Sequence, residues 1–500
     1  MPILPLQIPP GIYRAGTEYQ SRGRWYNASL VRFYSGTVQP VGGWAQMNAS
    51  AVTGRPCALF AWRPNVSAVG RWLFIGTESN AYVYDGSTTT DITPATFTTG
   101  DADASSTQGY GAGLYGADLY GTARTGAGGV TEVDAWHADA WGETLVATYT
   151  ADGKLLSWDL NTANNLTTIT NAPTDCAGLI VTAERMLMAL GAGGDRRKIQ
   201  WSTTEDYTTW TPSASNTAGD LLLSTDGRIV TGERVRGGNL IHTDVDAHFS
   251  AYIGSPFYYN IERVGDNCGI VSANAKVAVA SFVAWMSHNG FFIYDGYVKP
   301  LPCEVNDYVF SDINRVQISK VAAWHNGEWG EIWWFYPSAG SGENDRYVTW
   351  NYRENHWCIG TLARTCGIDK SVWDYPICAD SSGNWYEHEY GWTNDGTDRT
   401  TSVFIESGPT EIAPGERMAV LNQCIHDETD GANYLQMTLK TKFTPEGTEY
   451  TAGPYQLNAA DGYTDVLAQG RAFKVRVDET ASGQWKLGTL RFDVRLGSKR

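Results

Sequence analysis

Three short groups of acidic residues and histidines are the places where this 500-residue chain could do chemistry. The first is Asp244, Asp246 and His248, which stand at alternate positions, so their side chains would share one face of a strand. Two carboxylates and an imidazole on one face are typical of a metal site or of acid–base catalysis. A polar strand face or a loop explains the same residues, and we expect this structural role.

The other two groups are equally ambiguous. Glu387-His388-Glu389 is a run of three titratable residues, for which we again expect a structural role. Glu205-Asp206 stands between Trp201 and Trp210, a combination that binds sugars by stacking and hydrogen bonding. We favour the alternative, an exposed turn packed by tryptophans of the fold.

Motifs of known catalytic and cofactor sites do not occur in the sequence. There is no G-x-S-x-G, H-E-x-x-H or C-x-x-C sequence. The eight cysteines are too sparse for a disulfide scaffold, so we expect buried free thiols. We therefore predict a protein that is not an enzyme and has no catalytic residue, metal or cofactor.

Turn signals indicate the elements that must position these residues. Glycine makes up 54 of the 500 residues, about 11% against a usual 7%. Many of the glycines follow Asp or Asn between short aromatic or β-branched runs, as in Asp85-Gly86, Asp152-Gly153, Asn289-Gly290 and Asp395-Gly396. Such pairs favour tight hairpin turns. The chain is therefore predicted to be all-β and antiparallel.

Strand pairs that end in an aromatic residue recur along the chain. The aromatic ends are Tyr84, Trp158, Trp201, Phe249, Tyr294 and Trp350. Apart from a longer first interval, their spacing of roughly 40–55 residues is typical of propeller blades. We predict a β-propeller of about six blades over residues 51–400. A seventh blade is possible around Tyr375–Tyr390, unless that segment completes a blade with Leu30–Phe33 and Thr37–Val41.

The remaining parts of the chain have different textures. Residues 1–50 are expected to be an N-terminal arm with strands that help close the propeller. Residues 401–500 alternate strictly between apolar and polar, as in Leu435-Gln-Met-Thr-Leu439, which predicts a C-terminal β-sandwich-like domain. A short connecting helix is expected at Val305–Ile313, because Val305, Val309 and Ile313 would share its buried face.

A Gly/Tyr-rich insertion at 95–130 accounts for the longer first interval. Within it, Tyr110, Tyr115 and Tyr120 are each followed by glycine and lie five residues apart. We predict that this insertion forms a subunit interface or a channel loop. A surface loop is the alternative.

Charge is distributed unevenly. The chain carries −17 overall, and because residues 471–500 carry +5, residues 1–470 carry −22. An acidic protein is not suited to gripping the phosphates of DNA. Arg491, Arg495, Lys499 and Arg500 form a basic end, for which we predict a role in assembly; a solvated last strand is the alternative. We expect no signal peptide and no membrane anchor.

Several N-terminal segments resemble the start of bacteriophage tail proteins. They are Ile8-Pro-Pro-Gly-Ile-Tyr-Arg14, Arg24-Trp-Tyr-Asn27, Val31-Arg-Phe-Tyr34 and Pro40-Val-Gly-Gly-Trp44. Leu119-Tyr-Gly-Thr-Ala-Arg124 is similar to a segment of the same proteins, and Asn239–Pro302 is similar in pattern. The order of parts resembles the tail hub or nozzle proteins of short-tailed bacteriophages, including the packaged-DNA stabilisation group.

This resemblance implies a structural protein of the virion, made in the host cytoplasm and built into the tail. Six copies would form a ring beside the portal-proximal adaptor and the distal tail proteins. Genomic DNA would pass through the ring during ejection without specific binding. The alternatives are a glycan-binding or glycan-cleaving propeller of the tail-depolymerase kind, and a protein-interaction propeller.

Overall fold

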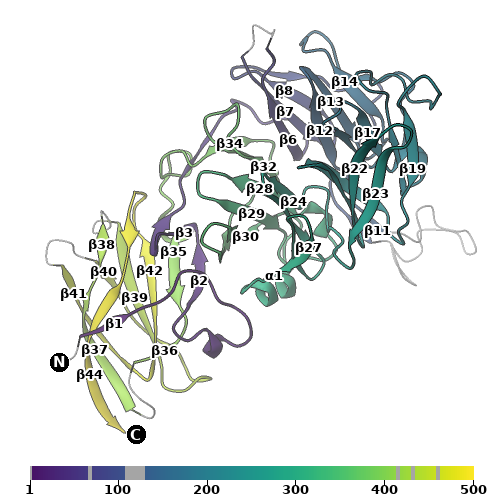
Figure 1. Cartoon of the computed structure of the whole chain (residues 1–500). Helices are drawn as coiled ribbons and strands as arrows, with labels where there is room; N and C mark the ends of the chain where they lie inside the picture. Colours follow the sequence, from purple (N-terminus) through teal and green to yellow (C-terminus); the bar gives the residue numbers. More distant parts are fainter. Residues whose placement is uncertain are drawn as a thin grey trace, which may run out of the picture.

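The computed structural model describes residues 3–65, 70–106, 130–412, 417–429, 434–457 and 462–499. These residues form two lobes, a β-propeller and a C-terminal β-sandwich (Figure 1). The predicted fold class is confirmed: the structure is almost entirely antiparallel β-sheet. No helix in the described ranges is long and apolar enough to cross a membrane.

Seven four-stranded sheets form the propeller, one more than the six blades counted from the sequence. The first three are β6–β9 (Pro56–Trp62, Trp72–Thr77, Ala81–Tyr84, Thr89–Asp91), β12–β15 (Trp136–Trp141, Thr144–Tyr149, Leu155–Trp158, Thr167–Thr168) and β16–β19 (Gly178–Val181, Leu187–Leu190, Lys198–Trp201, Gly219–Leu222). The next three are β20–β23 (Ile229–Val235, Gly238–Thr243, Ala247–Gly254, Tyr258–Gly265), β24–β27 (Lys276–Val279, Phe282–Ser287, Gly290–Tyr294, Val298–Leu301) and β28–β31 (Ala322–Asn326, Glu331–Tyr336, Arg346–Asn351, His356–Thr361). The first strand of the seventh sheet contacts β6, which closes the ring.

The seventh sheet is completed by a strand from the N-terminal arm. Its strands are β32 (Cys366–Ile368), β33 (Ile377–Ala379), β34 (Trp385–His388) and β5 (Trp44–Gln46). A seventh blade around Tyr375–Tyr390, one of the two alternatives left open by the sequence, is therefore present, but Leu30–Phe33 and Thr37–Val41 do not belong to it. Those residues form β3 (Val31–Tyr34) and β4 (Thr37–Pro40), and β4 pairs with β43 (Lys486–Leu487), which pairs with β38 (Glu428–Thr429).

The second strands of the blades are buried on both faces. All six residues of β29 are buried, and so are all six of β7. Both strands are mostly apolar, as a strand between two covered faces requires. Neighbouring blades also approach closely: a Cβ on Gly76 would lie 2.5 Å from the ring of Trp136 on the next blade, so only glycine fits there.

Two smaller features connect or extend the blades. The helix α1 (Asn306–Asp312) lies between the fifth and sixth sheets, and Val305, Val309 and Ile313 are buried, as the sequence predicted. The insertion begins at β10 (Ser105–Ser106) and returns at β11 (Val130–Thr131). Short 3-10 turns lie in the described residues at η1 (Glu18–Ser21), η2 (Ala192–Gly194), η3 (Ile318–Lys320) and η4 (Thr400–Ser402).

Two sheets enclose the core of the C-terminal lobe. One contains β1 (Ile3–Leu6), β44 (Leu490–Lys499), β37 (Arg417–Ile425) and β41 (Tyr463–Gly470). The other contains β2 (Trp25–Ser29), β35 (Phe404–Ser407), β42 (Ala472–Glu479), β39 (Leu435–Lys442) and β40 (Tyr450–Gln456), with β36 (Thr410–Glu411) beside β42. The alternation predicted for β39 is observed, because Leu435, Met437 and Leu439 are fully buried.

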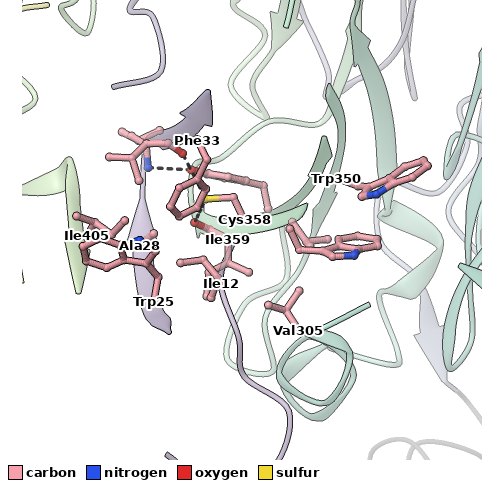
Figure 2. Packing of buried hydrophobic residues seen from close by; sticks show 14 of the residues in the cluster. Ile12, Trp25, Ala28, Phe33, Val305, Trp350, Cys358, Ile359 and Ile405 are labelled. Carbon is pink, nitrogen blue, oxygen red and sulfur yellow. Dashed lines mark hydrogen bonds between the residues drawn. The ribbon is translucent and has the colours of Figure 1, made fainter. Parts of the chain in front are cut away.

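The hydrophobic core runs from one lobe into the other. Figure 2 shows Trp25 and Phe33 of the N-terminal arm between Ile405 of the sandwich and Ile359 of the sixth blade, with Ile12 of the arm beside Ile359. The Ile12 amide donates to the Trp357 carbonyl at 2.8 Å, which fixes the arm to the blade. The arm therefore packs against both lobes, and both termini lie at the sandwich (Figure 1).

Candidate functional site

The first predicted group stabilises a turn in the fourth blade. Asp246 is buried and accepts hydrogen bonds from the hydroxyls of Thr225 (2.9 Å) and Thr243 (2.5 Å), while His248 Nε2 lies 3.1 Å from Asp246 Oδ1. Asp244 instead accepts from the Arg228 amide at 2.8 Å. The group is therefore divided between two structural networks. Within the described residues, no three His, Cys, Asp or Glu side chains are grouped as a metal site requires.

The run Glu387-His388-Glu389 sends its side chains to different surroundings. Arg364 Nε donates to His388 Nε2 at 2.9 Å, and Trp44 stacks on the imidazole at 5.5 Å. Burial, with the nearby charge of Arg364, holds the pKa of His388 well below its usual range. Burial also raises the pKa of the Glu387 carboxyl. The imidazole is thus a neutral part of the packing at the closing strand.

Glu389 belongs to a buried ionic cluster that the sequence did not reveal. Arg32 donates from Nε and Nη2 to both oxygens of Glu331 at 3.0 Å, and from Nη1 to Glu389 at 2.9 Å. The Arg32 and Glu331 side chains are each 3% exposed. Burial alone would raise the pKa of Glu389, but the charge and hydrogen bonds of Arg32 outweigh burial and lower it.

The Arg32 cluster joins β3 to the sixth and seventh blades, and all four carboxylate oxygens of Glu331 and Glu389 accept hydrogen bonds. Asn326 donates to Glu389 at 2.9 Å, and the Gly42 amide donates to the other oxygen at 3.1 Å. No motif could have signalled the cluster, because Arg32 and Glu331 are about 300 positions apart in the sequence.

Glu205-Asp206 forms a turn, as we favoured. Asp206 accepts from the Thr208 amide at 2.8 Å, and Glu205 forms an exposed ion pair with Arg185. Trp201 and Trp210 are only 3% and 2% exposed. Their faces are therefore covered by the blades and are closed to a sugar ring.

The predicted interface loop is described only at its base. Tyr110, Tyr115 and Tyr120 lie outside the described residues. The base is anchored to the sixth blade, because Gln317 exchanges two hydrogen bonds with the Ala104 backbone (2.8 and 2.9 Å) and Lys320 donates to Asp103 at 2.6 Å. It borders a hollow of about 430 Å³ lined by residues of several blades.

The structure describes only part of the predicted basic end. Arg491 and Arg495 lie on β44 with exposed side chains. The side chain of Lys499, and Arg500 as a whole, lie outside the described residues.

A polar cavity of about 250 Å³ lies where the seven first strands meet. It is lined by His137, Asp139, Glu233, Lys276 and small or apolar residues of the other blades. Burial lowers the pKa of His137 to about 3, and Lys276 Nζ lies 3.6 Å from Glu233. The cavity, which lies in the central tunnel of the propeller, forms only where strands from distant parts of the chain meet. No local sequence pattern could therefore have predicted it.

A wider groove of about 910 Å³ lies beside the β22–β23 hairpin. Its lining includes Phe257, which is 74% exposed, Ile253, which is 55% exposed, and Tyr258. Opposite them lie Pro212 and Asn216 from the loop before β19. This groove is the aromatic surface most open to a ligand among the hollows described here.

No family model and no curated protein matches this chain. Among solved structures it is similar to the WD40 domain of Pan2 from Neurospora crassa, at 10% identity over 71% of this chain and 95% of that chain, with a TM-score of 0.39. It is also similar to YCF48 bound to a D1 peptide (8%, 72% and 97%, 0.38) and to a streptogramin B lyase (9%, 69% and 96%, 0.40). Likeness at this level carries no information about function.

Proposed function

We propose that this chain is a structural protein of a bacteriophage tail, a hub or nozzle subunit that assembles into a ring around the path of DNA. The observation that carries the proposal is the order of parts, a propeller followed by a β-sandwich, which is the order that the sequence resemblance implies. In this role the chain acts through shape and assembly and has no catalytic step.

The segments that carry the resemblance also support the proposal, because they join the two lobes. Ile12 binds the sixth blade through its amide, Arg32 lies in the buried ionic cluster, and Trp44 begins the strand that completes the seventh sheet. These contacts fix the relative position of the propeller and the sandwich. A ring subunit needs such a fixed position, because a ring closes only if each copy presents the same angle to the next.

The propeller tunnel is unsuited to conducting DNA, so the conduit in this proposal lies between copies. The tunnel cavity measures about 250 Å³ and is lined in part by charged side chains. The major groove of B-DNA alone is about 12 Å wide, and the duplex is wider. A path between acidic subunits repels phosphates and avoids the basic contacts that would hold DNA in place.

Mass photometry and negative-stain electron microscopy of the purified full chain test the proposal. We expect closed rings, of six copies if the resemblance extends to stoichiometry, and no retention of duplex DNA at physiological salt. A chain that stays monomeric over a wide range of protein and salt concentrations would rule the role out.

A glycan-binding propeller is the second candidate, and the groove beside β22–β23 favours it. Phe257 and Tyr258 could stack on sugar rings there. In that case Phe257→Ala would abolish binding to a glycan array, while Tyr297→Ala, at a residue 82% exposed, would leave it unchanged. The ring proposal predicts no glycan binding by either variant or by the original chain.

A further inference from the structure

One face of the C-terminal sandwich has large apolar side chains at positions that point to solvent. Burial alternates strictly along β41, and its outward residues include Tyr463 and Leu467, which are 43% and 68% exposed. Ile3 on the edge strand of the same sheet is 51% exposed. A sheet with one solvated face normally carries polar residues on that face. These apolar residues therefore indicate a surface that is covered in the assembled protein.

Two arginines lie on the same face. Arg491 pairs in register with Ile425 of β37, and Arg495 pairs with Val420. Both guanidinium groups are exposed, and neither has an ion pair or hydrogen bond with any residue that the structure describes. Asp493, between them on the strand, and Asp465 on β41 give the face charges of both signs.

The cations on the opposite sheet are already paired. Lys440 and Arg476 bind Glu406, Arg476 also binds Asp478, and Lys442 and Lys474 bind Glu18 and Glu449. These pairs satisfy the outer surface of β39 and β42 within the chain. Of the cations compared here, Arg491 and Arg495 are the ones left available to a partner.

We propose that the outward face of the β1–β44–β37–β41 sheet docks on a carboxylate-rich surface of a second copy of this chain. The choice of a second copy rests on charge, since a chain with net charge −17 offers an excess of carboxylates to the two free arginines. The apolar residues supply the buried centre of the contact, and the arginines fix its direction. A contact between two different surfaces of one chain generates a ring when its rotation closes.

This inference rests on the proposed ring, and one set of variants tests the two separately. Analytical ultracentrifugation of the full chain would compare Leu467→Asp and the double variant Arg491→Glu/Arg495→Glu with the original chain. We expect each to raise the concentration of half-assembly at least tenfold. The matched controls Leu222→Asp and Arg263→Glu alter propeller residues of similar exposure, 57% for Leu222 and 54% for the Arg263 side chain, and should assemble normally.

Thermal unfolding shows whether the variants fold. Hydrogen exchange of the original chain tests the docking face without any substitution. We expect β41 and β44 to become protected at assembling concentrations. If the chain forms rings but the variants and the exchange of these strands are unchanged, the docking face is wrong and the ring stands. If the original chain never assembles, both proposals fail.

Discussion

Arg32 is a single residue on which the joint between the lobes depends. Its guanidinium group is buried between Glu331 and Glu389, and both carboxylates lose their counter-charge when it is removed. Breaking a buried ion pair by removing one partner costs about 3–5 kcal/mol. We therefore expect Arg32→Met to lower the free energy of unfolding by about this amount, as measured by urea denaturation.

Arg22 provides the control for this prediction. Its ion pair with Glu411 is exposed, with 57% of the arginine side chain accessible, and such pairs contribute about 0–1 kcal/mol. Arg22→Met should therefore change the stability little. Equal losses in the two variants would show that the buried cluster has no special role.

Buried histidines make the stability depend on pH. Burial lowers the pKa of His137, His242, His356 and His388, to about 3 for His137. In the unfolded chain a histidine titrates near pH 6.5, so below about pH 6.5 the unfolded state binds protons that the folded state does not. Stability is therefore fully present above that pH and should fall by up to about 1.4 kcal/mol per pH unit for each histidine.

Urea denaturation between about pH 7.5 and pH 5.5 measures this slope. His388→Gln should reduce the slope by the share of one histidine, and His288→Gln, at an exposed position, should not. A stability that stays constant over this interval would contradict the account.

For single residues, the sequence predicted whether a side chain has a structural role better than it predicted the hydrogen-bond partners of that side chain. It favoured structural roles for Asp246 and Glu389, and the structure gives each of them hydrogen bonds within the fold. It could not name Thr225, Asn326 or Arg32 as those partners, because these come from other elements. Contacts of this kind are set by tertiary packing, which leaves no local pattern.

The strand β5 is the element that completes the propeller. Trp44 pairs in register with His388, is 6% exposed, and donates from its indole nitrogen to Asn394 at 2.5 Å. Truncating a buried tryptophan costs about 3–5 kcal/mol. We expect Trp44→Ala to destabilise the chain by about this amount in thermal or urea unfolding, whereas Tyr297→Ala at an exposed position should have an effect below about 0.5 kcal/mol.

Limited proteolysis of the Trp44→Ala variant shows which part of the chain is destabilised. If β5 holds the ring closed, cleavage should appear first near β33 and β34. Cleavage confined to the sandwich would contradict the closing role.

Element prediction succeeded where the signal was local. Asp-Gly and Asn-Gly turns between aromatic runs predicted the hairpins, and spacing of Val305, Val309 and Ile313 predicted the short helix. The sequence left the seventh sheet open around Tyr375–Tyr390, because β32 and β33 have only three residues each and give a weak strand signal. Its fourth strand comes from the other end of the chain, and periodicity carries no information about such a pairing.

At the scale of the whole molecule, the N-terminal arm, the buried Arg32 cluster and the shared core make one unit of the propeller and the sandwich. The tunnel inside the propeller is small, about 250 Å³, and is lined in part by charged side chains. In the proposed ring, the acidic body and the open sheet face acquire their role when copies associate. On this account, DNA travels through a passage that a single copy does not contain.

Cryo-electron microscopy of the assembled full chain tests this central claim most directly. The account predicts a closed ring with an opening between copies wide enough for duplex DNA, an acidic wall around it, and the β1–β44–β37–β41 face buried at each contact. Isolated monomers, or a ring whose opening is lined by basic residues, would contradict it.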